Sequence, residues 1–99
     1  MTQHALYVQL EAKPGKEQEV ATFLSGARTM INDEPDTTAW FALKMGPRTF
    51  GIFDAFASEG GRDAHLRGKL AKQITSKADL FVKMPEMQRV EVLADKLPH

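Results

Sequence analysis

The chain contains no cysteine among its 99 residues. Disulfide bonds, thiolate metal sites and a cysteine nucleophile are therefore excluded. An excess of charge of one sign is also missing, because 13 Lys and Arg balance 13 Asp and Glu for a formal net charge of zero. Proteins that bind nucleic acid or an anionic membrane surface usually carry a basic excess. We therefore expect neither partner.

Long hydrophobic runs are absent as well. The longest, Ala39 to Leu43, is far shorter than the ~20 residues of a membrane-spanning helix. The N-terminus has neither the basic region nor the apolar core of a signal peptide, so we expect a cytoplasmic protein. Hydrophobic residues make up 42% and charged residues 26% of the chain, which is ordinary globular composition. This length predicts a single domain that spans residues 1–99.

Hydrophobic periodicity predicts strands and helices along the chain. A period of two, typical of strands, runs over residues 4–12, 37–45, 48–57 and 88–94. Helical spacing predicts a helix from Lys16 to Ile31 and a second helical stretch over residues 59–78, with Ser58 as its N-cap and a break near Gly68. Turn signals separate these segments at residues 14–15, 32–36 and 46–47.

The order β-α-β-β-α-β indicates an α+β, ferredoxin-like fold, with two helices on one face of a four-stranded antiparallel sheet. An open second face should be polar at alternate positions. Here both faces are apolar, since Trp40 and Phe41 point to opposite sides of one strand and Ile52 and Phe53 to opposite sides of the next. The simplest cover for the second face is the sheet of another subunit, so we expect a homodimer formed through the sheet faces.

Several segments resemble the antibiotic biosynthesis monooxygenase (ABM) domain family. The stretch Val8–Val20 resembles the family's opening, in which a first strand runs into a Pro-Gly turn and then an amphipathic helix. Thr38–Phe41 and Thr49–Phe56 resemble its paired second and third strands, and Ala64–Leu66 resembles the start of its second helix. The resemblance covers almost the whole chain and implies a dimeric α+β barrel, built by packing two ferredoxin-like sheets face to face.

The resemblance also implies a function. Some members of the family oxygenate aromatic polyketides or quinols without metal or flavin, and others degrade haem. A deprotonated phenol or anthrone can itself donate an electron to dioxygen, so such a site needs an apolar slot, a proton acceptor and donors for an anion. We expect a monooxygenase for a small aromatic, quinol-like or polyketide compound, with no cofactor and no metal. The alternative is a non-catalytic dimeric barrel that binds a hydrophobic small molecule or a protein partner.

Two residues are candidate catalytic groups. His65 is the only histidine outside the termini, and neutral imidazole accepts a proton near physiological pH; the alternative is a surface or capping histidine. Asp54 lies on a strand that is apolar on both sides, where a carboxylate needs a partner. It is either a base with a raised pKa or one half of a structural ion pair with an arginine, Arg62 or Arg48, of the same chain or of the second subunit of the dimer.

Four residues are candidate substrate-binding groups. Trp40, the only tryptophan, either stacks on an aromatic substrate or packs in the core or interface. Tyr7 either hydrogen-bonds a phenolate or packs at the dimer seam. Phe53 and Arg62 complete the set. We expect the pocket between the sheet and the second helical stretch.

Overall fold

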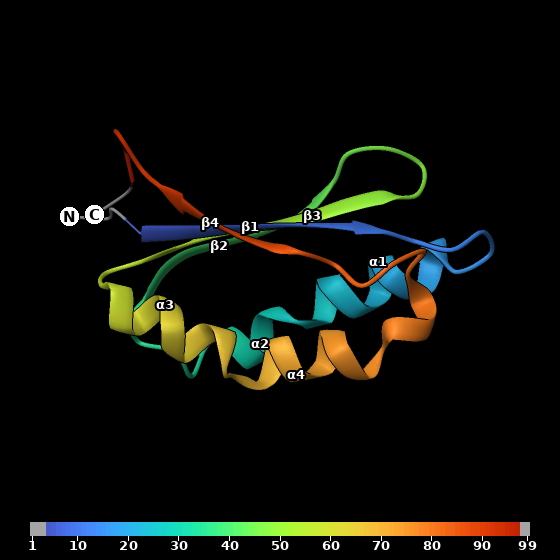
Figure 1. Cartoon of the computed structure of the whole chain (residues 1–99), viewed down its shortest axis with the longest axis horizontal. Helices are drawn as coiled ribbons and strands as arrows, with labels where there is room; N and C mark the ends of the chain where they lie inside the picture. Colours follow the sequence, from blue (N-terminus) through green and yellow to red (C-terminus); the bar gives the residue numbers. More distant parts are fainter. Residues whose placement is uncertain (1–3, 98–99) are drawn as a thin grey trace.

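The computed structural model in Figure 1 describes residues 4–97. Along the chain the elements are β1 (His4–Glu11), α1 (Glu17–Gly26), α2 (Arg28–Ile31), β2 (Thr37–Lys44), β3 (Thr49–Phe56), α3 (Glu59–Leu66), α4 (Lys69–Ser76), the 3-10 helix η1 (Ala78–Leu80) and β4 (Met87–Glu91). The strands form one antiparallel sheet in the order β2-β3-β1-β4, and the helices lie on one side of it (Figure 1). The predicted ferredoxin-like fold is confirmed.

The first helical segment is divided into more helices than its hydrophobic periodicity predicts. The first predicted helix is two helices, α1 and α2, joined at Ala27, whose N–H bonds to the carbonyl of Leu24 in a tightened turn. The second stretch breaks at Gly68, as expected, and Ser58 caps α3 by accepting a hydrogen bond from Gly61 N–H at 3.0 Å. The last strand ends at Glu91 rather than residue 94, because Glu91 pairs with His4, where β1 begins.

The core fills the space between the sheet and the helices. Strand register places Val8 and Ile52 side by side, with Leu10 and Phe50 as the next pair on the same face. Burying such side chains drives folding. They pack with apolar residues of the helices and of the segment after α4, namely Val20, Leu24, Ala27, Ile31, Leu70, Ile74 and Phe81.

The opposite face of the sheet carries exposed apolar side chains. Phe41, Phe53 and Tyr7 are directly paired across β2, β3 and β1 and form one aromatic row. Phe41 is 50% exposed, and Met45 reaches over the same face to lie 3.5 Å from the Tyr7 hydroxyl. Gly51 makes room for Met45, because a Cβ there would lie 2.9 Å from Met45 Cε. A single chain therefore leaves this face uncovered.

None of the helices within residues 4–97 is both long enough and apolar enough to cross a membrane.

Candidate functional site

Three side chains from separate parts of the chain meet at His65. Its Nδ1 lies 2.6 Å from Glu34 Oε1, and its Nε2 lies 2.8 Å from Asp54 Oδ2. Asp54 is 1% exposed and His65 is 7% exposed, so the cluster is largely shielded from water. Thr37 donates a further hydrogen bond to Glu34 at 2.8 Å. The imidazole thus bridges two carboxylates inside the protein.

The fold explains how these residues come together. Asp54 is on β3, directly opposite Trp40 of β2 and Leu6 of β1, and this row faces the helices. His65, near the end of α3, lies over the same part of the sheet, with its ring centroid 5.1 Å from that of Phe56. Glu34 belongs to the loop between α2 and β2.

Burial and charge set the proton affinities of the cluster. Burial raises the pKa of Asp54 above 3.8, and the nearby charge of Glu34 adds to this, while the His65 hydrogen bond offsets part of it. Burial works against a charged imidazole at His65, but the carboxylates of Asp54 and Glu34 outweigh it and raise the pKa above 6.5. The cluster therefore holds a proton more tightly than its isolated members would.

Both ring nitrogens of His65 are occupied by carboxylates, so the imidazole has no free position for a substrate proton. Asp54 Oδ1, by contrast, is buried without a hydrogen-bond partner among residues 4–97. Trp40 is paired with Asp54 across the strands, and its indole Nε1 is also buried without a hydrogen-bond partner among these residues. An unsatisfied buried polar group costs about 1–3 kcal/mol, so each of these two atoms needs a partner that the described residues do not supply.

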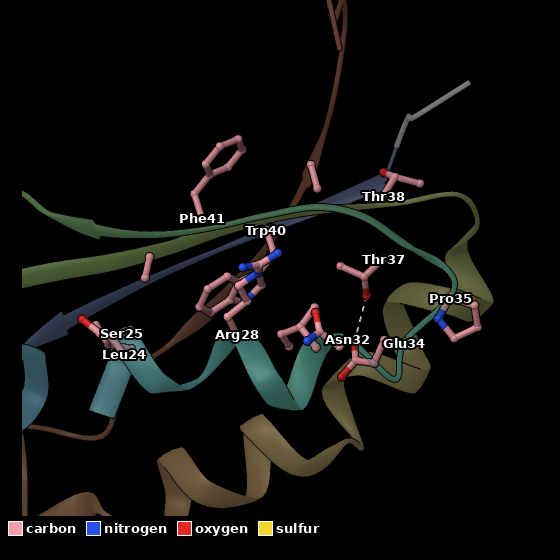
Figure 2. Close-up of a pocket in the computed structure, with 13 residues that line it drawn as sticks. Leu24, Ser25, Arg28, Asn32, Glu34, Pro35, Thr37, Thr38, Trp40 and Phe41 are labelled. Atoms are coloured by element: carbon pink, nitrogen blue, oxygen red, sulfur yellow. Dashed lines mark hydrogen bonds between the residues drawn. The ribbon is translucent and has the colours of Figure 1, made fainter. Parts of the chain in front are cut away.

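A cleft of ≈ 810 Å³ lies between β2 and the helices α1 and α2 (Figure 2). We call it the Trp40 cleft. Trp40 points from β2 toward the helices, and Phe41 points to the other side of the strand (Figure 2). The apolar residues that line the Trp40 cleft include Leu24, Ile31, Trp40 and Ala42, and the polar residues include Ser25, Arg28, Asn32 and Glu34. The size is within the usual range for a small-molecule site.

A smaller cleft of ≈ 260 Å³ opens over the Glu34–His65 pair, between the α2–β2 loop and the helices α3 and α4. This smaller cleft touches the second helical stretch, where we expected the pocket. The larger space lies instead beside β2. β2 is an edge strand of the sheet, and α1 and the four-residue α2 form the helical wall opposite it.

The other sequence-predicted residues lie apart from this cluster. Tyr7 and Phe53 are on the opposite face of the sheet from Trp40, Asp54 and His65. Arg62 does not pair with Asp54. Its buried guanidinium reaches the backbone carbonyls of Ala5 and Val90 at 3.5 Å, and its Nε has no hydrogen-bond partner within the described residues. The expected alternative of an Asp54–arginine ion pair is wrong within this chain, because His65 is the partner of Asp54 there.

Sequence reasoning missed two residues of the site. Glu34 lies in the turn cluster that ends the first predicted helix, and nothing local marks it as a partner of His65. Arg28 follows Ser25 and precedes Asn32 at helical spacing, which was a usable signal for a polar stripe on one helix face. Within residues 4–97, no group of three or more His, Cys, Asp or Glu residues is arranged to hold a metal ion.

Comparisons with known proteins place this chain among relatives. No protein-family model and no curated protein matches it. Among solved structures, the NE2512 protein of unknown function from Nitrosomonas europaea is 54% identical, with a TM-score of 0.96, over 100% of this chain and 97% of that chain. Such identity over the full length of both chains reflects common descent. The chain belongs to the family of NE2512.

More distant structures establish the fold. A putative antibiotic biosynthesis monooxygenase from Deinococcus radiodurans is 15% identical, with a TM-score of 0.80, over 97% of this chain and 98% of that one. Another from Nitrosomonas europaea is also 15% identical with a TM-score of 0.80, over 92% and 90%. This chain therefore has the fold of these putative ABM proteins, and the resemblance seen from Val8–Val20 onward is confirmed at the level of the fold. Fold alone leaves the activity open.

Proposed function

We propose that this protein is a cofactor-independent monooxygenase that acts on a small aromatic, quinol-like or polyketide compound bound in the Trp40 cleft. The observation that carries the proposal is the neighbouring pair of unpartnered groups, the acceptor Asp54 Oδ1 and the donor Trp40 Nε1, within the described residues. A phenolic or enolic hydroxyl is both a donor and an acceptor. A substrate oxygen that reached both groups would give its proton to Asp54 and accept a hydrogen bond from Trp40.

This arrangement suits oxygenation by dioxygen without a redox group in the protein. Asp54 takes the hydroxyl proton, and the indole N–H stabilises the resulting anion. The anion transfers one electron to dioxygen, and the substrate radical and superoxide combine to form a carbon–oxygen bond. Asp54 returns its proton to the peroxide anion. At a substrate CH₂ group the hydroperoxide then loses water to leave a ketone, so one oxygen atom stays in the product and the other leaves as water.

His65 and Glu34 are positioning residues in this scheme. His65 holds the second oxygen of Asp54 at 2.8 Å, which leaves Oδ1 as the oxygen without a partner among the described residues. Asp54 is 1% exposed and is not among the residues that line the Trp40 cleft, so side chains beside Trp40 must move before a substrate reaches this oxygen. The raised pKa of Asp54 makes its carboxylate a stronger proton acceptor than an exposed aspartate. Glu34 is 20% exposed and lines the cleft, so it connects the buried pair with solvent.

The working form is a cytoplasmic homodimer whose two sheets face each other. The aromatic row of Phe41, Phe53 and Tyr7, with Met45 and Leu43 beside it, is a contiguous apolar surface of the kind that a second subunit covers. In this assembly Tyr7 and Phe53 serve the interface rather than the Trp40 cleft of their own chain.

A second candidate function is non-catalytic binding of a hydrophobic small molecule or a protein partner. The occupied ring nitrogens of His65 favour it, because Glu34, His65 and Asp54 also link a loop, a helix and the sheet as a purely structural cluster would. The two functions differ in whether Asp54 is needed for chemistry or only for stability.

An oxygen-consumption assay with a panel of quinols and anthrones separates these functions. Replacing a positioned base typically costs ~10²- to 10⁴-fold in rate, so we expect Asp54→Asn to lower kcat by about that factor while Asn keeps the shape of the side chain. Asp79→Asn, at an exposed position in η1, is the matched control and should turn over at the parent rate.

Trp40→Phe supplies a second arm, since it removes the indole N–H and keeps an aromatic ring; its kcat should fall as well. The monooxygenase proposal would be contradicted if the parent consumed no oxygen with any member of the panel, or if a folded Asp54→Asn variant kept the parent kcat. Either result would favour the binding function.

A further inference from the structure

We propose that the Trp40 cleft selects aromatic compounds that carry a carboxylate, and that Arg28 binds this group. The inference rests on the proposed function of the cleft and names its substrate class. It comes from the one cationic side chain among the described residues that line the cleft, a residue that the sequence pattern did not single out.

Arg28 is placed to face a ligand. It is the first residue of α2, and Ser25 and Asn32, three residues before it and four after it, line the cleft with it. Figure 2 shows the Arg28 side chain rising from α2 toward β2, on the side of the strand from which Trp40 projects. Ser25, Arg28 and Asn32 thus form a polar stripe on the helical wall of the cleft, opposite Trp40 and Ala42 of the sheet wall.

The charge of Arg28 is not neutralised within the described part of the chain. Its guanidinium forms no ion pair there, whereas Arg89 pairs with Asp63 at 3.2 Å. Among residues 4–97, the only other charged side chain that lines the cleft is Glu34, and its carboxylate is held by His65 and Thr37. The cleft therefore offers an available cation and, from these residues, no comparable available anion.

The chemistry of the donors indicates a carboxylate. A guanidinium is a planar fork of N–H donors that matches the two oxygens of a carboxylate, and such charge-assisted pairs are stronger than neutral ones. One arginine without a second cation suits a monoanion better than a phosphate dianion. A cleft of ≈ 810 Å³ has room for fused rings between Trp40 and this group. The expected ligand has an aromatic body, a hydroxyl toward Trp40 and Asp54, and a carboxylate at Arg28.

The test is a binding titration followed by ¹⁵N NMR of the indole N–H, which reports from the cleft without ambiguity because Trp40 is the only tryptophan. The probes are 2-naphthoate and its uncharged methyl ester. We expect the parent to bind the acid more tightly than the ester, and Arg28→Gln to weaken binding of the acid by about tenfold while the ester is unaffected. Arg48→Gln, at an exposed arginine in the β2–β3 hairpin, is the matched control and should bind the acid like the parent.

Added salt should weaken binding of the acid more than binding of the ester. Equal affinity of the two probes for the parent, parent-like affinity of Arg28→Gln for the acid, or the absence of any Trp40 response to 2-naphthoate would each overturn the proposal. Since binding is measured without turnover, an Arg28-dependent response together with no oxygen consumption would retain the carboxylate site and remove the monooxygenase function.

Discussion

At the scale of single residues, the hydrogen-bond partners of Asp54 and His65 differ from what their side-chain chemistry alone suggests. A histidine with an ordinary pKa is the natural general base in this chain, yet its two nitrogens are engaged at 2.6 and 2.8 Å. The aspartate keeps one oxygen without a partner among the described residues and sits beside the indole of Trp40. Packing thus determines which nitrogen or oxygen of these two side chains remains without a hydrogen-bond partner among the described residues.

The cluster predicts how stability depends on pH. The pKa of His65 is raised in the folded protein, so its contribution to stability is complete below the unfolded value of 6.5 and is lost as the pH rises through the folded value. The raised pKa of Asp54 acts in the same direction, because the folded state again binds more protons than the unfolded state. We expect the free energy of unfolding by urea to fall as the pH rises above 6.5.

His65→Gln should flatten this slope, since it removes the titrating imidazole. The slope, rather than the absolute stability, is the relevant quantity, because the substitution also changes the hydrogen bonds of both carboxylates. Equal slopes in the parent and in His65→Gln would contradict the prediction.

At the scale of elements, the loop of residues 32–36, which we call the strap, lies against α3. Its Glu34 bonds to His65, and the Asp36 carbonyl accepts a hydrogen bond from Ala57 N–H at 3.0 Å. Two glycines permit this close approach. A Cβ on Gly61 would lie 2.7 Å from Asp36 Cβ, and one on Gly68 would lie 3.2 Å from Glu34 Oε2. The strap forms part of both clefts, so its position controls their shape.

A pair of adjacent glycines tests this packing. Gly→Ala inside a helix ordinarily stabilises by about 0.5–1 kcal/mol, and we expect that gain at Gly60, where the nearest atom to an added Cβ is Ser58 Oγ at 3.8 Å. At Gly61 the added methyl would push the strap away from α3, so Gly61→Ala should instead destabilise the protein by about 1–3 kcal/mol. Urea unfolding measures the change in free energy of unfolding for each variant. A Gly61→Ala variant more stable than the parent would contradict the prediction.

At the scale of the whole molecule, the sheet has helices on one face and an aromatic row on the other (Figure 1). A chain of 99 residues buries a modest core, and covering a second apolar face adds hydrophobic area that this core does not provide. Pairing of two copies through this face would satisfy both needs at once, and it is the assembly that the ABM resemblance implies.

A charge in the aromatic row tests the dimer. The parent should have a light-scattering mass of about twice the 11.0 kDa of one chain, and Phe41→Glu should shift it toward the single-chain mass, because an unpaired carboxylate would be buried in the interface. Gln73→Glu, on the exposed side of α4, adds the same charge on the helical layer and should leave the mass unchanged. A parent that runs as a monomer at micromolar concentration would rule the assembly out.

Local sequence was sufficient for the four strands, the two helical stretches and their order, but not for the division of the first helix at Ala27. Alternation around Val8 and Ile52, the Pro14-Gly15 turn and the Ser58 cap act over a few residues, so their patterns predict strands, a turn and a helix start without reference to the rest of the chain. The same alternation placed Asp54 among buried residues and marked it as a carboxylate in need of a partner. Such predictions rely on the fixed directions of side chains along a strand or a helix, which are the same in every protein.

Only the tertiary structure decided that the partner of the Asp54 carboxylate is His65, which in turn pairs with Glu34. Glu34 and His65 are separated by 31 residues and meet only because the strap crosses α3 where the glycines allow it. This crossing engages Nδ1 of the imidazole, while Asp54 of β3 engages Nε2 through Oδ2 and keeps Oδ1 without a partner among residues 4–97. The Trp40 cleft between β2 and the helices α1 and α2 is likewise a product of packing. Burial, hydrogen-bond partners and proton affinity depend on atoms brought together through space, and these have no signature in the spacing of residues along the chain.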